Sequence, residues 1–267
     1  MKREPAVCGQ FYPATERLLR EQIESMVDKD AVREKVLGVV SPHAGYIYSG
    51  PVAGSLFSHI EITDTVVILG PNHTGLGSTF SLYEKGSWTT PLGEVKIDEK
   101  LAADIKERCE LIEGDEAAHS HEHSLEVQIP FMQYFKPDFK IVPIVVSNAS
   151  HESYEMVGNA IAGAIKKSRR QVLIVASSDM THYEPYELAK AKDKIAIDAI
   201  LKLDEKQLLD NISKHDITMC GYIPTTIMLI ASKALGAKSA KLIKYQTSGD
   251  ISGDYSAVVG YAGVIVQ

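Results

Sequence analysis

Short apolar runs rich in β-branched residues recur along the chain, and longer segments with helical periodicity separate them. The clearest runs are KVLGVV, TVVILG, FKIVPIVVS and QVLIVASS, at residues 35–40, 65–70, 139–147 and 171–178. Strands that are apolar along their whole length are typical of a parallel sheet covered by helices on both faces. The sequence therefore predicts an α/β fold, with three α/β/α layers around a mostly parallel central sheet.

Helical patterns fill the intervals between these runs. The segments expected to be helical are 14–27, 50–60, 99–111, 124–135, 153–167, 185–203 and 224–236. Pro130 is expected to kink the fourth of them, and Gly236 to end the last. The runs 240–248 and 256–267 and a hairpin around Trp88 are expected to add antiparallel strands. No linker interrupts the pattern, so residues 1–267 are predicted to form a single domain.

Charge and cysteine usage narrow the functional classes. The net charge is -7 and there is no long Lys/Arg-rich run, which argues against a nucleic-acid partner. No segment reaches the ~20 uninterrupted apolar residues of a membrane span, and the amino terminus lacks the apolar core of a secretory signal. Cys8, Cys109 and Cys220 lie far apart and form no CxxC pair. These features predict a cytoplasmic protein without a membrane partner.

Histidines and an aspartate follow the apolar runs where each run ends. His43 follows in SPHAG, His73 in PNHTG, Asp179 and His182 in SSDMTHY, and His151 in SNASH. The carboxyl ends of parallel strands share one edge of a sheet, and ligand sites form there. A single loop histidine is more often solvated or hydrogen-bonded, but the repetition favours convergence. Histidine is both the commonest metal ligand and the commonest general base.

A cysteine precedes the last predicted helix. Cys220 lies in MCGYIP, just before the helix that starts near Pro224. A helix amino terminus favours the thiolate, the form of cysteine that binds metal. The alternative, a buried and inert cysteine, is the commoner fate of a free thiol.

The densest histidine cluster is AAHSHEHSLEVQIPF, residues 117–131. Its HxH spacing looks like a metal pair, but it lies in a polar loop at the start of a predicted helix. His119 and His121 are expected to be solvated. His123 and Glu126, three residues apart on one helical face, are expected to orient the metal ligands or contact a substrate rather than bind metal.

The motifs GQFYPA, SPHAGYIYSGPVAGSLF, VVILGPNHTG, EHSLEVQIPF, SSDMTHY and MCGYIP occur in the order found in the MEMO family. The chain resembles this family over nearly its whole length, and the family is similar in fold to the class III extradiol dioxygenases. Those enzymes bind Fe(II) with two histidines and a carboxylate. The resemblance implies that His43 and His73 are metal ligands and that Cys220 takes the place of the carboxylate. It also implies that His182 is an acid/base residue, oriented by Asp179.

The resemblance further implies the surroundings and partners of the site. Tyr46 and Asn72 are expected at the substrate pocket or around the ligands, and His151 is given no role. The expected cofactor is an iron or copper ion, with zinc possible, because a thiolate is softer than a carboxylate. The expected partners are a small-molecule or peptide ligand and, functionally, AMMECR-like and radical SAM proteins.

Three functions remain open on this basis. The first is a redox enzyme with a dioxygenase-like metal pocket, favoured by the histidines at the strand ends and by the motif match. The second is a non-enzymatic module that binds a peptide or metabolite in the same pocket. The third is a zinc hydrolase, because two histidines and a cysteine leave a fourth zinc position for water.

Overall fold

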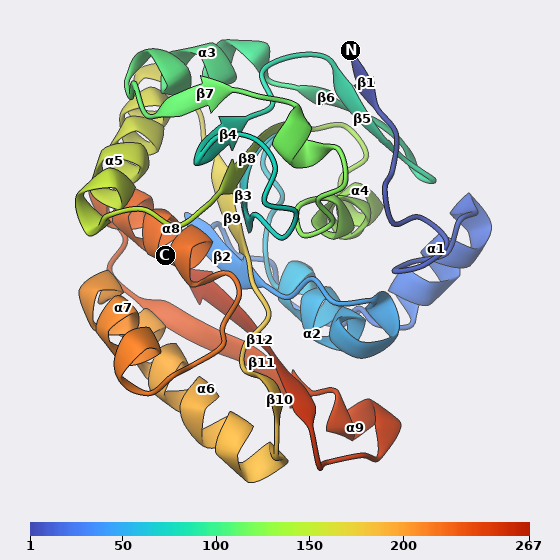
Figure 1. Ribbon diagram of the computed structural model, residues 1–267. Coiled ribbons are helices and arrows are strands. Elements are labelled where there is room, and N and C mark those ends of the chain that lie inside the picture. Colours follow the sequence, from blue (N-terminus) through green and yellow to red (C-terminus); the bar gives the residue numbers. More distant parts are fainter.

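A twelve-stranded sheet runs through the molecule in the computed structural model, which describes residues 1–267 (Figure 1). Its centre consists of parallel strands in the order β8, β3, β9, β2, spanning Lys140–Val146, Thr65–Pro71, Leu173–Ser177 and Gly38–Ser41. Nearly every residue of these strands is buried, as their uniform apolar character requires. The predicted α/β fold with a mostly parallel central sheet is confirmed.

Shorter and antiparallel strands extend both sides of this centre. Beside β8 lie β6, β5, β1, β4 and β7, spanning Gly93–Ile97, Ser87–Thr90, Lys2–Arg3, Phe80–Leu82 and Ile112–Gly114. Strands β5 and β6 form the hairpin predicted around Trp88, and β6 continues the sheet parallel to β8. Beside β2 lie β12, β11 and β10, spanning Val258–Val266, Ala240–Thr247 and His182–Glu184, all joined by antiparallel pairing.

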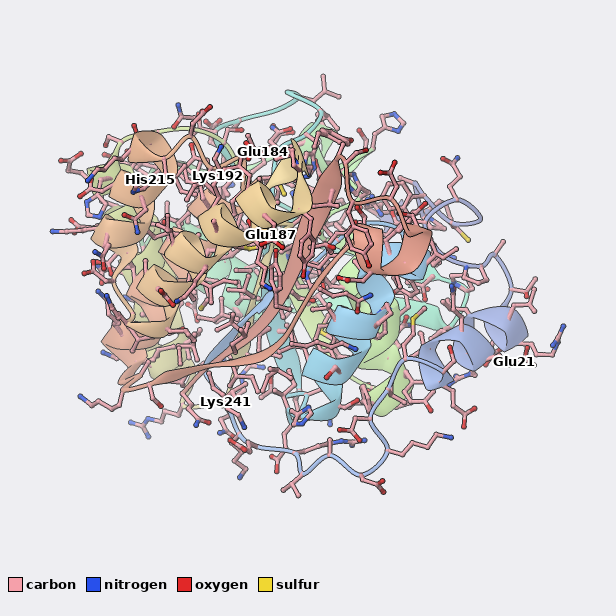
Figure 2. The ribbon with its side chains drawn as sticks, turned by 90° about the horizontal axis from the view of Figure 1, so that it is seen from below. Glu21, Glu184, Glu187, Lys192, His215 and Lys241 are labelled. Atoms are coloured by element: carbon pink, nitrogen blue, oxygen red, sulfur yellow. The ribbon has the colours of Figure 1, made fainter.

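Helices cover both faces of the sheet. One face carries α3, α5, α8, α7 and α6, each packed on the next; they span Glu99–Glu107, His151–Ser168, Tyr222–Leu235, Glu205–Lys214 and Tyr186–Leu201 (left side of Figure 1). The other face carries α1, α4 and α2, spanning Glu16–Glu24, Ile129–Phe135 and Tyr46–Ser58. Figure 2 shows α6 lying along β11 and β12, with the ion pair of Lys192 and Glu184 near its amino end. None of the helices is long and apolar enough to cross a lipid bilayer.

Local chemistry explains where several elements begin and end. Gly236 ends α8 in the left-handed conformation (φ 107°), as predicted. Pro130 does not kink a helix: a 3-10 turn, η2 (Glu126–Gln128), comes first, and Pro130 lies in the first turn of α4. A proline is tolerated there because no intrahelical bond needs its missing N–H. Two further short elements, η1 (Ala117–His119) and α9 (Gly249–Ser252), lie in loops.

Candidate metal centre

Three side chains expected at the site follow neighbouring parallel strands. His73, Asp179 and His43 each lie two residues beyond the last residue of β3, β9 and β2. Because these strands are adjacent and parallel, the three loops emerge at one edge of the sheet. The repeated strand–loop pattern of the sequence is thus a real spatial grouping.

The imidazoles of His43, His73 and His123 converge at this edge. One ligand atom of each lies within 4.8 Å of the others, so the three could hold a metal ion. The ring centroids are 5.2 Å apart for His43 and His73, and 4.7 Å apart for His73 and His123. His43 is buried, whereas the side chains of His73 and His123 are 34% and 22% exposed. The cluster therefore has a protein side and a solvent side.

A buried hydrogen-bond network fixes the His43 ring. Ser177 Oγ donates its single proton to the carbonyl of Ser124 (2.6 Å) and accepts from Nε2 of Gln128 (2.8 Å). Ser177 can therefore only accept from His43 Nδ1, at 2.9 Å. Gln128 also donates to the carbonyl of Pro42 (2.9 Å). The proton of His43 must lie on Nδ1, which leaves the Nε2 lone pair free for the cluster.

Glu122 fixes His73 in the same way. Its buried carboxylate accepts the main-chain N–H of His73 (2.7 Å) and faces His73 Nδ1 (2.9 Å). The N–H of Ser124 donates to the same carboxylate (2.9 Å). Since a carboxylate only accepts, the Nδ1 of His73 carries a proton and its Nε2 points elsewhere. Such an outer carboxylate is typical of metal-binding histidines.

The surroundings set the charges of these groups. Burial and the neighbouring imidazoles lower the pKa of His43 well below 6.5, so this ring is neutral. Burial also acts to lower the pKa of His73, but the hydrogen bond and charge of Glu122 outweigh it and raise that pKa. Burial acts to raise the pKa of Glu122, yet the bonds from His73 and Ser124 bring it to about 2. Burial lowers the pKa of His123.

Cys220, expected as the third ligand, lies beside His43 but outside the group of three mutually close donor atoms, where His123 stands instead. Its Sγ is 3.2 Å from Nε2 of His43 and accepts from the main-chain N–H of Asp179 (3.3 Å). Burial and the Asp179 carboxylate raise the pKa of this thiol, so burial outweighs the nearby start of α8. The next residue, Gly221, is packed so tightly that a Cβ there would lie 2.2 Å from the carbonyl oxygen of Ser177. The sulfur is thus held against the strand end of β9.

Asp179 and His182 lie close to the cluster but have different partners from those expected. Asp179 Oδ1 accepts the main-chain N–H groups of His43 (2.7 Å) and Ala44 (3.3 Å), and burial raises its pKa. His182 is oriented by Thr218, because its Nδ1 faces the Thr218 carbonyl (2.9 Å) and its N–H donates to Thr218 Oγ1 (2.7 Å). Its Nε2 therefore remains available. Asp179 holds the His43 loop, while Thr218 holds His182.

Tyr46 and Asn72 have structural partners. The buried Tyr46 hydroxyl donates to the carbonyl of Val127 (2.6 Å), and its ring packs on Phe131. Asn72 Oδ1 accepts the N–H of Gly75 (2.9 Å) and its Nδ2 donates to the Leu76 carbonyl (2.8 Å), so it closes the loop that holds His73.

The histidine-rich segment differs most from expectation. His119 is not solvated: it is fully buried, its Nε2 lies 2.9 Å from the Ser81 carbonyl, and burial lowers its pKa to about 4. His121 is exposed, as predicted. His123, expected beside the ligands, brings its donor atom into the cluster itself. His151 lies apart at the start of α5, with Nδ1 3.6 Å from Glu155.

Glu122 is the residue that sequence reasoning missed. Two carboxylates, Glu122 and Glu126, occur in the same segment four residues apart, and the sequence favoured Glu126. In the structure Glu122 faces His73, whereas Glu126 accepts hydrogen bonds from Arg3 and Ala6 near the amino terminus. The available signal was that Glu122 directly precedes His123.

The fold and the site together define a class: an α/β/α protein with a histidine-rich candidate metal centre at the carboxyl edge of a parallel sheet. The family model described as Memo-like protein matches residues 3–265, and the chain belongs to that family.

Several archaeal relatives match over almost the whole chain. MEMO1 family proteins of Methanocaldococcus jannaschii and Methanosarcina mazei are each 46% identical, over 99% of this chain and 99% of theirs. One from Sulfolobus acidocaldarius is 44% identical over 99% of both. A crystal structure of an uncharacterised protein from Escherichia coli K12 shares the fold, with a TM-score of 0.61, 15% identity and coverage of 87% of this chain and 100% of that one.

Proposed function

We propose that this chain is a metal-dependent redox enzyme that binds one iron or copper ion through His43, His73 and His123, with Cys220 beside them as a further ligand. The observation that carries the proposal is the convergence of three imidazole donor atoms within 4.8 Å of one another. Imidazole suits iron, copper and zinc, and a thiol 3.2 Å from His43 Nε2 favours a softer ion such as copper.

The donor set fits a metal ion in its protonation as well as its geometry. The Nδ1 protons of His43 and His73 are committed to Ser177 and Glu122, so each ring would bind the ion through Nε2. The low pKa of His43 removes proton competition at that ligand. Metal binding requires neutral imidazoles, which burial favours at His43 and His123. Glu122 raises the pKa of His73, so this ring must lose its second proton when it binds the ion.

A bound iron or copper ion would supply one-electron chemistry at this edge of the sheet. The residues of the chain would bind the substrate and transfer protons. The partly exposed rings of His73 and His123 leave the solvent side open to a small-molecule or peptide ligand. His182 can hold or release a proton at Nε2, because Thr218 occupies its Nδ1.

The cellular setting is part of the same proposal. All three cysteines are free, which suits a reducing, cytoplasmic compartment. Membership of the Memo family supports a functional association with AMMECR-like and radical SAM proteins.

A zinc hydrolase is the second candidate. Three histidines without a carboxylate in the group resemble the His₃ sites of catalytic zinc, in which a fourth position holds water. Its distinguishing property is a metal that does not change oxidation state.

The test is elemental analysis and electron paramagnetic resonance of protein purified without oxygen or chelator. The proposal expects about one iron or copper ion per chain, whose signal changes reversibly on oxidation and reduction. Zinc alone, together with ester or amide cleavage, would favour the hydrolase. A chain without metal that still binds a peptide or metabolite in this pocket would contradict both and leave a binding module.

A further inference from the structure

The amino-terminal residues 3–12, here called the amino-terminal strap, carry a buried cation that the proposed chemistry does not use. Arg3 is 6% exposed and lies 4.2 Å above the Trp88 ring. Its guanidinium donates to the carbonyls of His119 (2.7 Å) and Glu122 (2.8 Å) and to Glu126 Oε2 (2.7 Å). All three acceptors belong to the segment 119–126, here called the His123 loop, which carries His123 and its neighbour Glu122 between η1 and η2.

Glu126 completes the buried pair from the other side. Its side chain is 1% exposed, and its two oxygens accept from Arg3, from the main-chain N–H groups of Ala6 (2.7 Å) and Val7 (3.1 Å), and from the hydroxyl of Tyr12 (2.7 Å). A buried carboxylate is tolerated only when it is paired and hydrogen-bonded in this way. Arg3 and Glu126 therefore fix the strap to the loop.

The strap also contacts His123 and the segment that follows His43. The Phe11 ring lies 4.8 Å from the His123 ring. The Phe11 carbonyl accepts the N–H of Tyr46 (2.8 Å), at the start of α2, three residues after His43. One short segment thus ties the loop of His123 to the loop of His43.

We propose that Arg3 is a positioning residue for the metal centre. Through the carbonyl of Glu122 and the carboxylate of Glu126, it sets where the loop presents Glu122 to His73 and His123 to the ion. This role rests on the proposed metal site. A planar guanidinium suits it because its fork can reach three acceptors at once, which a lysine ammonium cannot do in the same geometry.

The test compares Arg3→Met with Arg170→Met in the full chain, with Co²⁺ as the probe. Arg170 is the matched control, because it also pairs with a buried carboxylate, Asp98 (2.7 Å), but next to Thr65 at the opposite end of β3. We expect Arg3→Met to weaken Co²⁺ binding by about tenfold or more and to change the visible absorption spectrum of the bound ion. Arg170→Met should leave affinity and spectrum as in the wild type.

Arg3→Lys is the milder variant if Arg3→Met does not fold, since it keeps the charge and loses the fork. It should bind Co²⁺ more weakly, with an altered spectrum. Wild-type affinity and spectrum in a folded Arg3 variant would overturn the positioning role alone. Failure of the wild-type chain to bind Co²⁺ would instead overturn the proposed metal site, and the positioning role with it.

Discussion

Glu122 accepts two hydrogen bonds from His73, one from its main-chain N–H at 2.7 Å and one from its Nδ1 at 2.9 Å. The first bond fixes the loop and the second fixes the rotation of the ring. The carboxylate is fully buried, while the imidazole that it holds is 34% exposed. A buried carboxylate therefore orients the partly exposed imidazole of His73.

Glu122→Gln should weaken metal binding by about 10- to 100-fold, because loss of an outer partner usually costs that much. The amide cannot accept both bonds with a full charge, so the His73 ring would lose its fixed orientation. Isothermal titration with Co²⁺ or Zn²⁺ measures the effect. Glu155→Gln is the control, since Glu155 lies beside His151, away from the cluster. Equal affinities in the two variants would contradict this role of Glu122.

Metal affinity should depend on pH through His73. Protonated imidazole cannot bind metal, and the pKa of His73 is raised above 6.5 by Glu122 in spite of burial. Affinity should therefore be highest above this raised pKa and fall as the pH decreases through it. His43 adds nothing to this fall, because its pKa is well below 6.5.

Co²⁺ titrations from about pH 8 to about pH 5 would measure this dependence across the usual histidine range. In Glu122→Gln the fall should begin at a lower pH, because the raising charge is gone. An affinity that stays constant over this range, or a midpoint that Glu122→Gln does not move, would argue against His73 as a ligand.

Ser177→Ala should reduce both stability and metal affinity. The substitution removes the hydroxyl that donates to the Ser124 carbonyl and accepts from His43 Nδ1. It also removes one of the acceptors of the Gln128 amide, which keeps the Pro42 carbonyl. We expect a loss of about 1–3 kcal/mol in the free energy of unfolding, measured by urea denaturation of the metal-free protein. Ser25→Ala, at an exposed helix end, should change it by less than about 0.5 kcal/mol. A loss no larger than that of the control would show that the network is dispensable.

Gly221→Ala tests how firmly the Cys220 loop is held. A Cβ there would lie 2.2 Å from the Ser177 oxygen and 2.4 Å from Ser178 Cβ, so the loop must move. We expect a cost of about 1–3 kcal/mol in stability and a displaced sulfur. Gly45 is the control, because its φ is -54° and a Cβ there would lie no nearer than 3.7 Å to another residue. Alanine should be tolerated at this position. Thermal unfolding compares the two, and equal stability would refute the tight packing at Gly221.

The sequence predicted the features that depend on local patterns repeated along the chain. The central strands are apolar along their length, which required helices on both faces, and parallel pairing brought His43 and His73 to one edge. By contrast, helix α7 was not predicted. It is short and mostly polar, and only Glu205 and Leu208 are buried, so its apolar face is small even though its pattern is amphipathic.

The rest of the site depends on long-range partners that no local pattern encodes. His119 looks like a solvated loop residue until the strap places Arg3 on its carbonyl and the core closes over it. The roles of Glu122 and Glu126 are likewise set by residues distant in the sequence. His73 is the partner of Glu122, and Arg3 is the partner of Glu126.

Metal content per chain in single histidine variants tests the central claim most directly. His43→Ala, His73→Ala and His123→Ala are compared with His121→Ala, an exposed histidine in the same loop as His123. We predict about one tightly bound ion per chain in the wild type and in His121→Ala, and loss of that ion in each of the other three. Full metal content in His43→Ala, His73→Ala or His123→Ala would contradict a centre built on these imidazoles.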